Sequence, residues 1–224
     1  MKKNEKLILF DYDGTIVDSA PMIVNGALEA FKQCGIPKPD PTKVKENIGK
    51  PLAVALKEYM PKGYNVSAKK ISDAYKNWYA EQGKLGLQNE PLFNGMKELI
   101  QNFKKRKELH LGVATNKSRI ALNNGLIKHN LINLFDITLT TDENNPKPEP
   151  DMALYAMKKL NINRESTIMI GDTINDILMA VNSKINSIGV AWGYNDVKTL
   201  ESAGATIIVS DAKELEQYLE HNFL

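Results

Sequence analysis

The sequence predicts an α/β protein in which a doubly wound parallel sheet carries an inserted helical cap domain. Short runs of apolar residues recur along the chain, and such runs are typical of strands that are buried on both faces. Helical patterns separate most of these runs, and this alternation indicates βαβ units. Residues 19–90 interrupt the alternation, because they contain helical patterns and no convincing strand.

Six apolar runs are the candidate strands of the sheet. The first covers residues 7–10 and ends at Asp11. The other five lie at 109–114, 137–140, 167–170, 187–191 and 206–209. Between the strands we expect helices near residue types that favour a helix N-terminus, namely Asn94, Ser118, Pro150 and Asp211.

The interrupting segment divides the chain into two predicted domains. Its helical patterns cover 19–34, 42–48, 51–60 and 67–84. We therefore expect a core formed by residues 1–18 and 91–224 and a cap formed by residues 19–90. The cap carries 11 lysines against 7 acidic residues, whereas the remainder carries 18 basic against 20 acidic residues. This difference in charge fits two domains with different roles.

The composition excludes several classes of protein. Of the 224 residues, 42% are hydrophobic and 25% are charged, which is ordinary for a soluble globular chain. A net charge of +2 argues against nucleic acid as a partner, and no apolar run approaches the ~18 residues of a membrane span. Cys34 is the single cysteine, so we expect no disulfide, no cysteine-based zinc site and a cytoplasmic location. The oligomeric state stays open.

Polar residues follow four of the predicted strands. The clusters are Asp11 with Asp13, Thr115 with Asn116, Lys147, and Asp172 with Asp176. Because the carboxyl ends of parallel strands meet at one edge of a sheet, we expect these side chains to converge on one crevice.

The residue types in these clusters indicate phosphoryl transfer. Carboxylates gathered in one crevice repel each other and favour a hard cation such as Mg²⁺. One carboxylate can act as a nucleophile, while a second protonates the leaving oxygen and then deprotonates water. A threonine hydroxyl and a lysine ammonium can hold the phosphoryl oxygens in the transition state.

The same clusters resemble the four motifs of the haloacid dehalogenase-like phosphohydrolase superfamily. The matching segments are Asp11-Tyr12-Asp13-Gly14-Thr15, Thr115-Asn116, Lys147, and Gly171-Asp172-Thr173 with Asp176. Their order and spacing match, and the resemblance covers nearly the whole chain. It implies a Rossmann-like core, a Mg²⁺ cofactor and a small phosphorylated metabolite as substrate.

The resemblance also implies roles for individual residues. Asp11 would be the nucleophile and a Mg²⁺ ligand, and Asp13 would be the general acid and base, with its main-chain carbonyl on Mg²⁺. Thr115 and Lys147 would bind the phosphate, and Lys147 would also restrain Asp11.

Four further residues have less direct assignments. Asp172 would be a direct Mg²⁺ ligand, and Asp176 would act through water or by orienting its neighbours. Asn116 either contacts the substrate or caps the following helix. Lys50, in a short loop of the cap, either pairs with a second anionic group of the substrate or is a solvated surface lysine.

The helical insert between the first and second motifs resembles the cap of the phosphoglycolate phosphatase-like branch. We therefore expect a Mg²⁺-dependent phosphatase that hydrolyses a small phosphomonoester, with phosphoglycolate-like substrates favoured, through an aspartyl phosphate. One departure is Ser183-Lys184, where the family usually has an Ala-Gly pair, which puts the geometry of that loop in doubt.

Other functions share parts of this pattern. A sugar-phosphate mutase of the β-phosphoglucomutase kind is the nearest rival, although such mutases often have an apolar residue where Thr15 stands. A pyrophosphatase or nucleotidase would use the same core residues. A phosphoreceiver module also gathers acids around Mg²⁺, but its phosphorylated Asp follows a later strand and it has no inserted cap. Dehalogenases replace the second acid of the first motif, so Asp13 argues against them.

Overall fold

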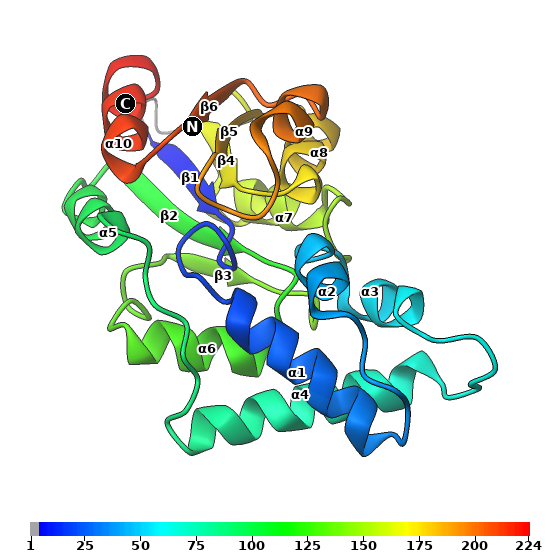
Figure 1. Ribbon diagram of the computed structural model, residues 1–224. Helices are drawn as coiled ribbons and strands as arrows, with labels where there is room; N and C mark the ends of the chain where they lie inside the picture. Colours follow the sequence, from blue (N-terminus) through cyan, green and yellow to red (C-terminus); the bar gives the residue numbers. More distant parts are fainter. Residues whose placement is uncertain (1–4) are drawn as a thin grey trace.

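A six-stranded, fully parallel sheet forms the centre of the protein in the computed structural model, which describes residues 5–224 (Figure 1). The strand order is β3-β2-β1-β4-β5-β6, as predicted for a doubly wound sheet. Each strand agrees with its apolar run to within one residue at either end. The strands are β1 (Lys6–Phe10), β2 (Leu109–Ala114), β3 (Ile137–Leu139), β4 (Thr167–Gly171), β5 (Asn186–Val190) and β6 (Ile207–Val209).

Helices cover both faces of this sheet. Side chains of β1 alternate between the two faces, so Ile8 and Phe10 join one apolar cluster and Leu7 and Leu9 join another. The first cluster is completed by α5 (Met96–Lys104), α6 (Arg119–Lys128) and α10 (Ala212–Asn222). The second is completed by α7 (Asp151–Leu160) and α8 (Ile174–Ser183), while α9 (Val197–Ser202) packs against β5 and β6.

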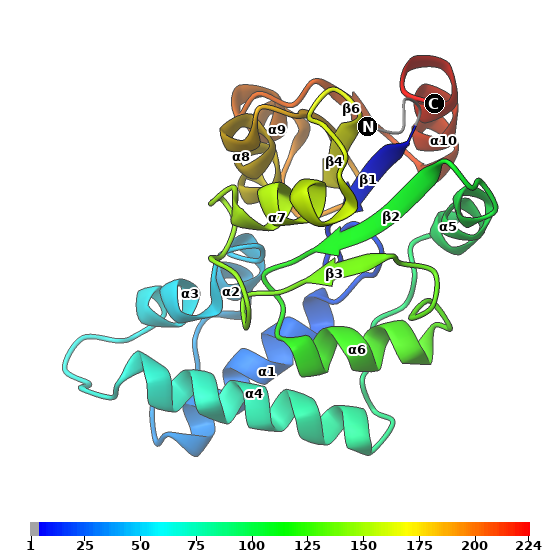
Figure 2. The same ribbon diagram turned by 180° about the vertical axis from the view of Figure 1, so that it is seen from behind.

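Four helices between β1 and α5 lie together on one side of the sheet (Figures 1 and 2). They are α1 (Ala20–Gln33), α2 (Pro41–Glu46), α3 (Leu52–Glu58) and α4 (Ala68–Lys84). They bury an apolar cluster of their own around Phe31, Leu56 and Ile71. We call α1 to α4 the cap helices. The division into a core of 1–18 and 91–224 and a cap of 19–90 stays a prediction.

The chain leaves the sheet for the cap helices and returns from them at neighbouring points. The backbone N–H of Asp18, just before α1, donates to the carbonyl of Pro91 at 2.8 Å. The side chain of Tyr194 reinforces this point, because its hydroxyl accepts from the backbone N–H of Ser19 at 2.9 Å. The segment that enters the cap helices and the segment that leaves them are therefore hydrogen-bonded to each other close to the sheet.

The predicted helix starts are correct in three places and wrong in one. The Asp211 side chain accepts from the N–H of Glu214 at 2.8 Å, and Ser118 and Pro150 directly precede α6 and α7. The prediction that Asn94 caps the next helix is wrong, because Gly95 precedes α5. Gly95 has a φ of 80°, a left-handed conformation that glycine adopts without a steric penalty, and it delays the helix by one residue.

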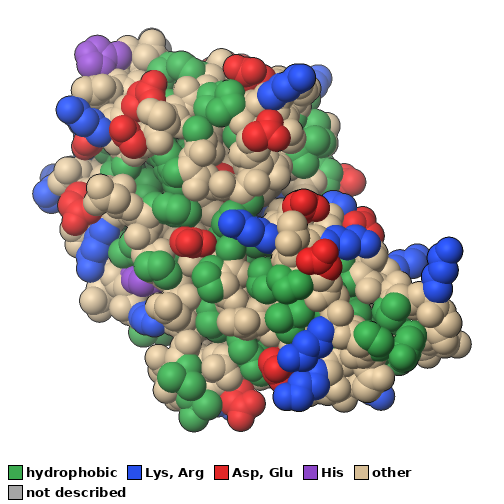
Figure 3. All heavy atoms as spheres, in the orientation of Figure 1, with side chains coloured by type: hydrophobic (Ala, Val, Ile, Leu, Met, Phe, Trp, Pro, Cys, Tyr) green, Lys and Arg blue, Asp and Glu red, His purple; other side chains and the backbone are tan. Residues whose placement is uncertain are grey.

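One face of the molecule shows mixed charge. On the face drawn in Figure 3, basic and acidic side chains are interspersed rather than gathered into one basic area.

Among the described residues 5–224, no helix combines the length and the apolar character that a membrane crossing requires.

The segment Ser183-Lys184, where the sequence departs from the family pattern, still forms a compact helix end. Lys184 adopts the left-handed conformation, with a φ of 57°, at the C-terminus of α8. The N–H groups of Lys184 and Ile185 donate to the carbonyls of Val181 and Ala180, both at 3.0 Å. The loop therefore keeps the turn that glycine would favour, at a steric cost to Lys184.

Replacing Lys184 with glycine should relieve this cost. We expect Lys184→Gly to raise the free energy of unfolding by roughly 0.5–1 kcal/mol, the left-handed penalty less the extra flexibility of unfolded glycine. Urea unfolding measures the change. Lys184→Ala is the matched control, since it removes the long side chain but keeps the penalty. Equal stabilisation by both substitutions would contradict the argument.

Candidate active site

The candidate site lies at the carboxyl edge of the sheet, where the strand order reverses between β1 and β4. Asp11 directly follows β1, and Asp172 directly follows β4, so the parallel pairing of these strands places the two carboxylates side by side. Asp176 reaches the same place from the first turn of α8. Crevices at such reversal points are the usual ligand sites of doubly wound sheets.

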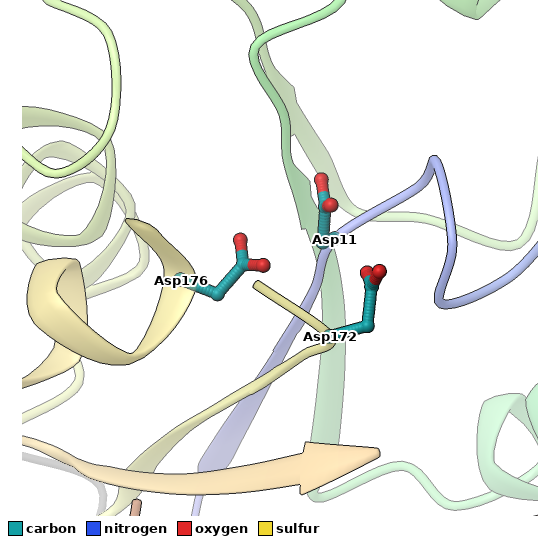
Figure 4. Close-up of side chains that lie close together, drawn as sticks. All are labelled: Asp11, Asp172 and Asp176. Atoms are coloured by element: carbon teal, nitrogen blue, oxygen red, sulfur yellow. The ribbon is translucent and has the colours of Figure 1, made fainter. Parts of the chain in front are cut away.

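Asp11, Asp172 and Asp176 form an acidic triad (Figure 4). Each offers a carboxylate oxygen, the three oxygens lie within 4.8 Å of one another, and all three residues are buried. Glycines make this crowding possible. A Cβ atom on Gly14, which has a φ of 92°, or on Gly193 would lie 2.1 Å from the Asp172 side chain.

Hydrogen bonds fix the orientation of Asp172. The Thr15 hydroxyl donates to its Oδ1 at 2.8 Å, and the backbone N–H of Tyr194 donates to its Oδ2 at 2.9 Å. Asp176 is fixed by the start of α8, where its Oδ2 accepts from the N–H and the hydroxyl of Thr173 at 2.9 and 2.7 Å. Asp176 therefore caps its own helix and faces the triad with its other oxygen.

Lys147 is the cation that faces the triad. Its buried Nζ lies 2.7 Å from Asp11 Oδ1 and 2.5 Å from Asp176 Oδ1, and it also donates to the carbonyl of Ala114 at 2.9 Å. Asn116 holds the loop that carries this lysine, because its Oδ1 accepts from the backbone N–H of Lys147 at 2.9 Å. The lysine thus restrains two of the three carboxylates.

The electrostatic environment of the triad favours an added cation. Burial raises the pKa of the Asp11 carboxyl to about 7, and the Asp176 carboxylate adds to the rise while Lys147 opposes it. Burial, followed by the charges of Asp11 and Asp176, raises the pKa of Asp172 well above its usual range. When all three carboxyls are ionised, they leave an excess of two negative charges over the single ammonium, and an added cation favours that state.

The triad fits a magnesium ion on the chemistry of its donors. All three side chains offer oxygen atoms, which are the ligands that Mg²⁺ prefers, and the charge excess equals the charge of the ion. The residues that could hold the ion are therefore Asp11, Asp172 and Asp176, with the main-chain carbonyl of Asp13 as the further donor that the sequence pattern implies.

The side chain of Asp13 pairs with a second lysine. Its Oδ1 accepts from the Nζ of Lys117 at 2.8 Å, and this lysine also contacts Glu90 and Tyr79. No catalytic or binding role was predicted for Lys117, Glu90 or Tyr79. The position of Lys117 directly after Thr115-Asn116 was a usable signal. No comparable signal marked Glu90 and Tyr79, since each is an isolated residue far from any motif.

A cavity of about 310 Å³ lies between the carboxyl edge of the sheet and the cap helices. The sheet side contributes five of the predicted site residues: Asp11, Asp13, Thr115, Asn116 and Lys147. The cap side is mostly apolar and includes Ile23, Ile48, Leu52 and Tyr75. The cavity therefore has polar side chains on its sheet side and mostly apolar side chains on its cap side.

Two predicted binding residues take part in contacts of their own. Lys50 borders the cavity, but its Nζ lies 2.8 Å from Glu58 Oε2 in a partly exposed ion pair. The amide of Asn116 donates to the carbonyl of Gly49 in the cap at 3.0 Å, besides holding the loop of Lys147. Asn116 thus has a structural role beside any contact with substrate.

Comparisons with known proteins agree with this site. Residues 8–190 match the sequence profile of haloacid dehalogenase-like hydrolases. The chain is 31% identical over 212 residues to the probable phosphatase IndB of Dickeya dadantii, covering 93% of this chain and 91% of that protein. It is also 31% identical over 202 residues to a phosphoglycolate phosphatase of Colwellia psychrerythraea, covering 87% and 88% of the two chains.

A solved structure shares the whole fold. The crystal structure of a predicted phosphatase from Clostridium acetobutylicum superposes with a TM-score of 0.84 at 29% identity, covering 96% of this chain and 98% of that one. Together with the profile match and the acidic triad at the carboxyl edge of the sheet, this likeness places the chain in the haloacid dehalogenase-like hydrolase family.

Proposed function

We propose that the protein is a Mg²⁺-dependent phosphatase that hydrolyses a small phosphomonoester through an aspartyl phosphate on Asp11. One observation carries the proposal: the Asp11 carboxylate borders the cavity while Lys147 holds one of its oxygens and the other acids of the triad surround it. Membership of the hydrolase family and the phosphatase names of its relatives support the same activity.

The first half of the reaction forms the covalent intermediate. Lys147 binds Asp11 Oδ1, which leaves Oδ2 to attack the phosphorus atom. As the new P–O bond forms, the bond from phosphorus to the leaving oxygen breaks, and Asp13 gives that oxygen a proton. The Thr115 hydroxyl, on the sheet side of the cavity, holds a phosphoryl oxygen. Bound Mg²⁺ would offset the charge of the phosphoryl oxygens and align them with the carboxylate.

The second half of the reaction regenerates the enzyme. Asp13 is ionised after the leaving group has taken its proton, so it can accept a proton from an incoming water molecule. The resulting hydroxide attacks the phosphorus atom, the bond to Asp11 breaks, and inorganic phosphate leaves. One carboxyl group therefore serves as acid and then as base, and both aspartates return to their starting state.

The substrate lies beneath the cap helices in this proposal. A site closed by a cap suits small molecules, because closure must remove water from around them. The motif resemblance favours a phosphoglycolate-like ester. Thr15 stands where such mutases often have an apolar residue, which favours the phosphatase over the sugar-phosphate mutase, and its hydroxyl anchors Asp172. A pyrophosphatase or nucleotidase would share every residue on the sheet side, so the leaving group must be identified by experiment.

Replacing Asp11 with asparagine tests the proposal directly. The amide keeps the shape but is a poor nucleophile, so phosphate release should fall by roughly 10³-fold or more. A screen of about a hundred small phosphoesters with Mg²⁺ supplies the substrates. Circular dichroism checks that Asp11→Asn keeps its fold, and turnover near the wild-type rate in the folded variant would refute the assignment.

The metal role of Asp172 has its own test. Asp172→Asn removes one of the three charges that would bind Mg²⁺, so the Mg²⁺ concentration for half-maximal activity should rise at least about tenfold. Calorimetric titration with Mg²⁺ measures binding without turnover. Asp211→Asn, at the start of α10, is the matched control. Identical Mg²⁺ titrations of wild type and Asp172→Asn would contradict the role.

Lys50 is the proposed contact for a second anionic group of the substrate. Its ion pair with Glu58 is partly exposed, and such pairs are worth only about 0–1 kcal/mol, so the ammonium can exchange partners cheaply. Lys50→Ala should raise KM for phosphoglycolate several-fold and spare p-nitrophenyl phosphate, as expected when uniform binding is lost. Lys57→Ala, on an exposed position of α3, is the control. Equal effects on both substrates would show that Lys50 does not contact the leaving group.

A further inference from the structure

A second buried ion cluster lies beside the acidic triad, and Asp13 is the one member of it that the proposed reaction uses. Its centre is the Nζ of Lys117, which lies 2.8 Å from Asp13 Oδ1, 2.8 Å from Glu90 Oε1 and 3.1 Å from the hydroxyl of Tyr79. The Tyr79 hydroxyl in turn donates to Glu90 Oε1. We call these four residues the Lys117 cluster.

The Lys117 ammonium has no donor left for a substrate. An ammonium carries three N–H groups, and Asp13, Glu90 and Tyr79 supply three acceptors. The lysine side chain is only 5% exposed, and its Nζ also lies 4.6 Å from the centre of the Tyr79 ring. Lys117 is therefore suited to fixing its neighbours and not to binding a phosphate.

The cluster joins parts of the chain that are distant in sequence. Asp13 belongs to the loop after β1, Lys117 to the loop after β2, and Tyr79 to the cap helix α4. Glu90 lies in the segment that returns from α4 to the sheet. A change in the position of α4 therefore alters the contacts of the lysine that holds Asp13.

Glu90 is fixed firmly on the sheet side of this connection. Its main-chain carbonyl lies 2.7 Å from Nε2 of His129 at the end of α6, and its Oε2 accepts from Nε2 of Gln88 at 2.7 Å. The preceding segment differs, because Leu85 and Leu87 are exposed and Gly86 has a φ of 70°. The segment between α4 and Gln88 is therefore the part of this connection that can bend, and a shift of α4 would move Tyr79 relative to Glu90.

The charges of the cluster show how strongly its members depend on each other. Burial acts to raise the pKa of Glu90, but the Lys117 ammonium and the hydrogen bonds to the carboxylate together hold it below its usual range. Burial acts to lower the pKa of Lys117, yet Asp13 and Glu90 together raise it well above its usual range. A buried ion that loses a partner is costly, so the members hold each other in place.

We propose that Lys117 is a positioning residue that holds the Asp13 carboxyl at the edge of the cavity. Glu90 holds Lys117 from the sheet side, and Tyr79 completes this hold only while α4 is seated against the sheet. Asp13 is then oriented for proton transfer when the cap is closed over a substrate. The inference rests on the proposed function, since it assigns Asp13 the proton-transfer role.

The test compares two substrates that differ only in their leaving group. Phenyl phosphate and p-nitrophenyl phosphate have nearly the same size, but the phenolate needs a proton more than the nitrophenolate does. Asp13→Asn sets the reference and should lose roughly 10²–10⁴-fold in kcat on phenyl phosphate and much less on p-nitrophenyl phosphate. Lys117→Met should show the same selectivity, with a loss of about 10–100-fold on phenyl phosphate and little change in KM.

Tyr79→Phe tests the link to the cap. This variant keeps the ring beside Lys117 and removes only the hydroxyl, so a smaller loss on phenyl phosphate, about 3–10-fold, is expected. Combined with Lys117→Met it should cause no further loss, because both substitutions act through the same contact. If Lys117→Met fails to fold, the leaving-group selectivity of Tyr79→Phe decides alone.

The controls separate this inference from the proposed function. Lys104→Met removes an ammonium from an ion pair with Asp136, which directly precedes β3 at the opposite edge of the sheet, and should leave both rates unchanged. The proposed function is tested separately, by phosphate release in the wild type and its loss in Asp11→Asn. Equal losses on the two substrates, a change confined to KM, or additive losses in the double variant would overturn the role of Lys117.

Discussion

The close approach of three buried carboxylates to a single ammonium is the constraint on which the site depends. Asp11, Asp172 and Asp176 would repel each other without Lys147, whose Nζ contacts two of them. The sheet supplies the positions, because β1 and β4 are adjacent and parallel and both end at this point. Glycines at 14 and 193 leave the room that the carboxylate of Asp172 occupies. Backbone, glycines and lysine together therefore stabilise a charge excess that a divalent cation can neutralise.

Much of the fold could be predicted because its determinants are local. Strands buried on both faces need unbroken apolar runs, and each of the six runs became a strand. Helix starts were less certain. Asp211 caps α10 with its side chain, as its residue type predicts. The start of α5 depends instead on the left-handed Gly95, although the neighbouring Asn94 is the more usual residue type at a helix N-terminus. Residue type alone does not reveal which of two adjacent residues adopts the unusual backbone conformation.

The candidate site could also be predicted only where its determinants are local. The meeting of Asp11, Asp172 and Lys147 could be anticipated, because residues that follow parallel strands share an edge. The partners of Asp13 could not, since Lys117, Glu90 and Tyr79 come from three separate segments whose meeting depends on how α4 docks. The ion pair of Lys50 could not be predicted either, because Lys50 precedes α3 and Glu58 ends it, and no sequence pattern marks a pair eight residues apart along that helix.

The hydrogen bond between Asp18 and Pro91 has an evolutionary consequence. Because the chain departs and returns at adjacent points of one backbone ladder, a short turn could bridge them without disturbing the sheet. The cap helices between those points can therefore change in length or sequence while the carboxyl edge of the sheet stays intact. Such changes alter the walls of the cavity and leave the acidic triad in place. One sheet can in this way support cavities that admit different molecules above the same three carboxylates.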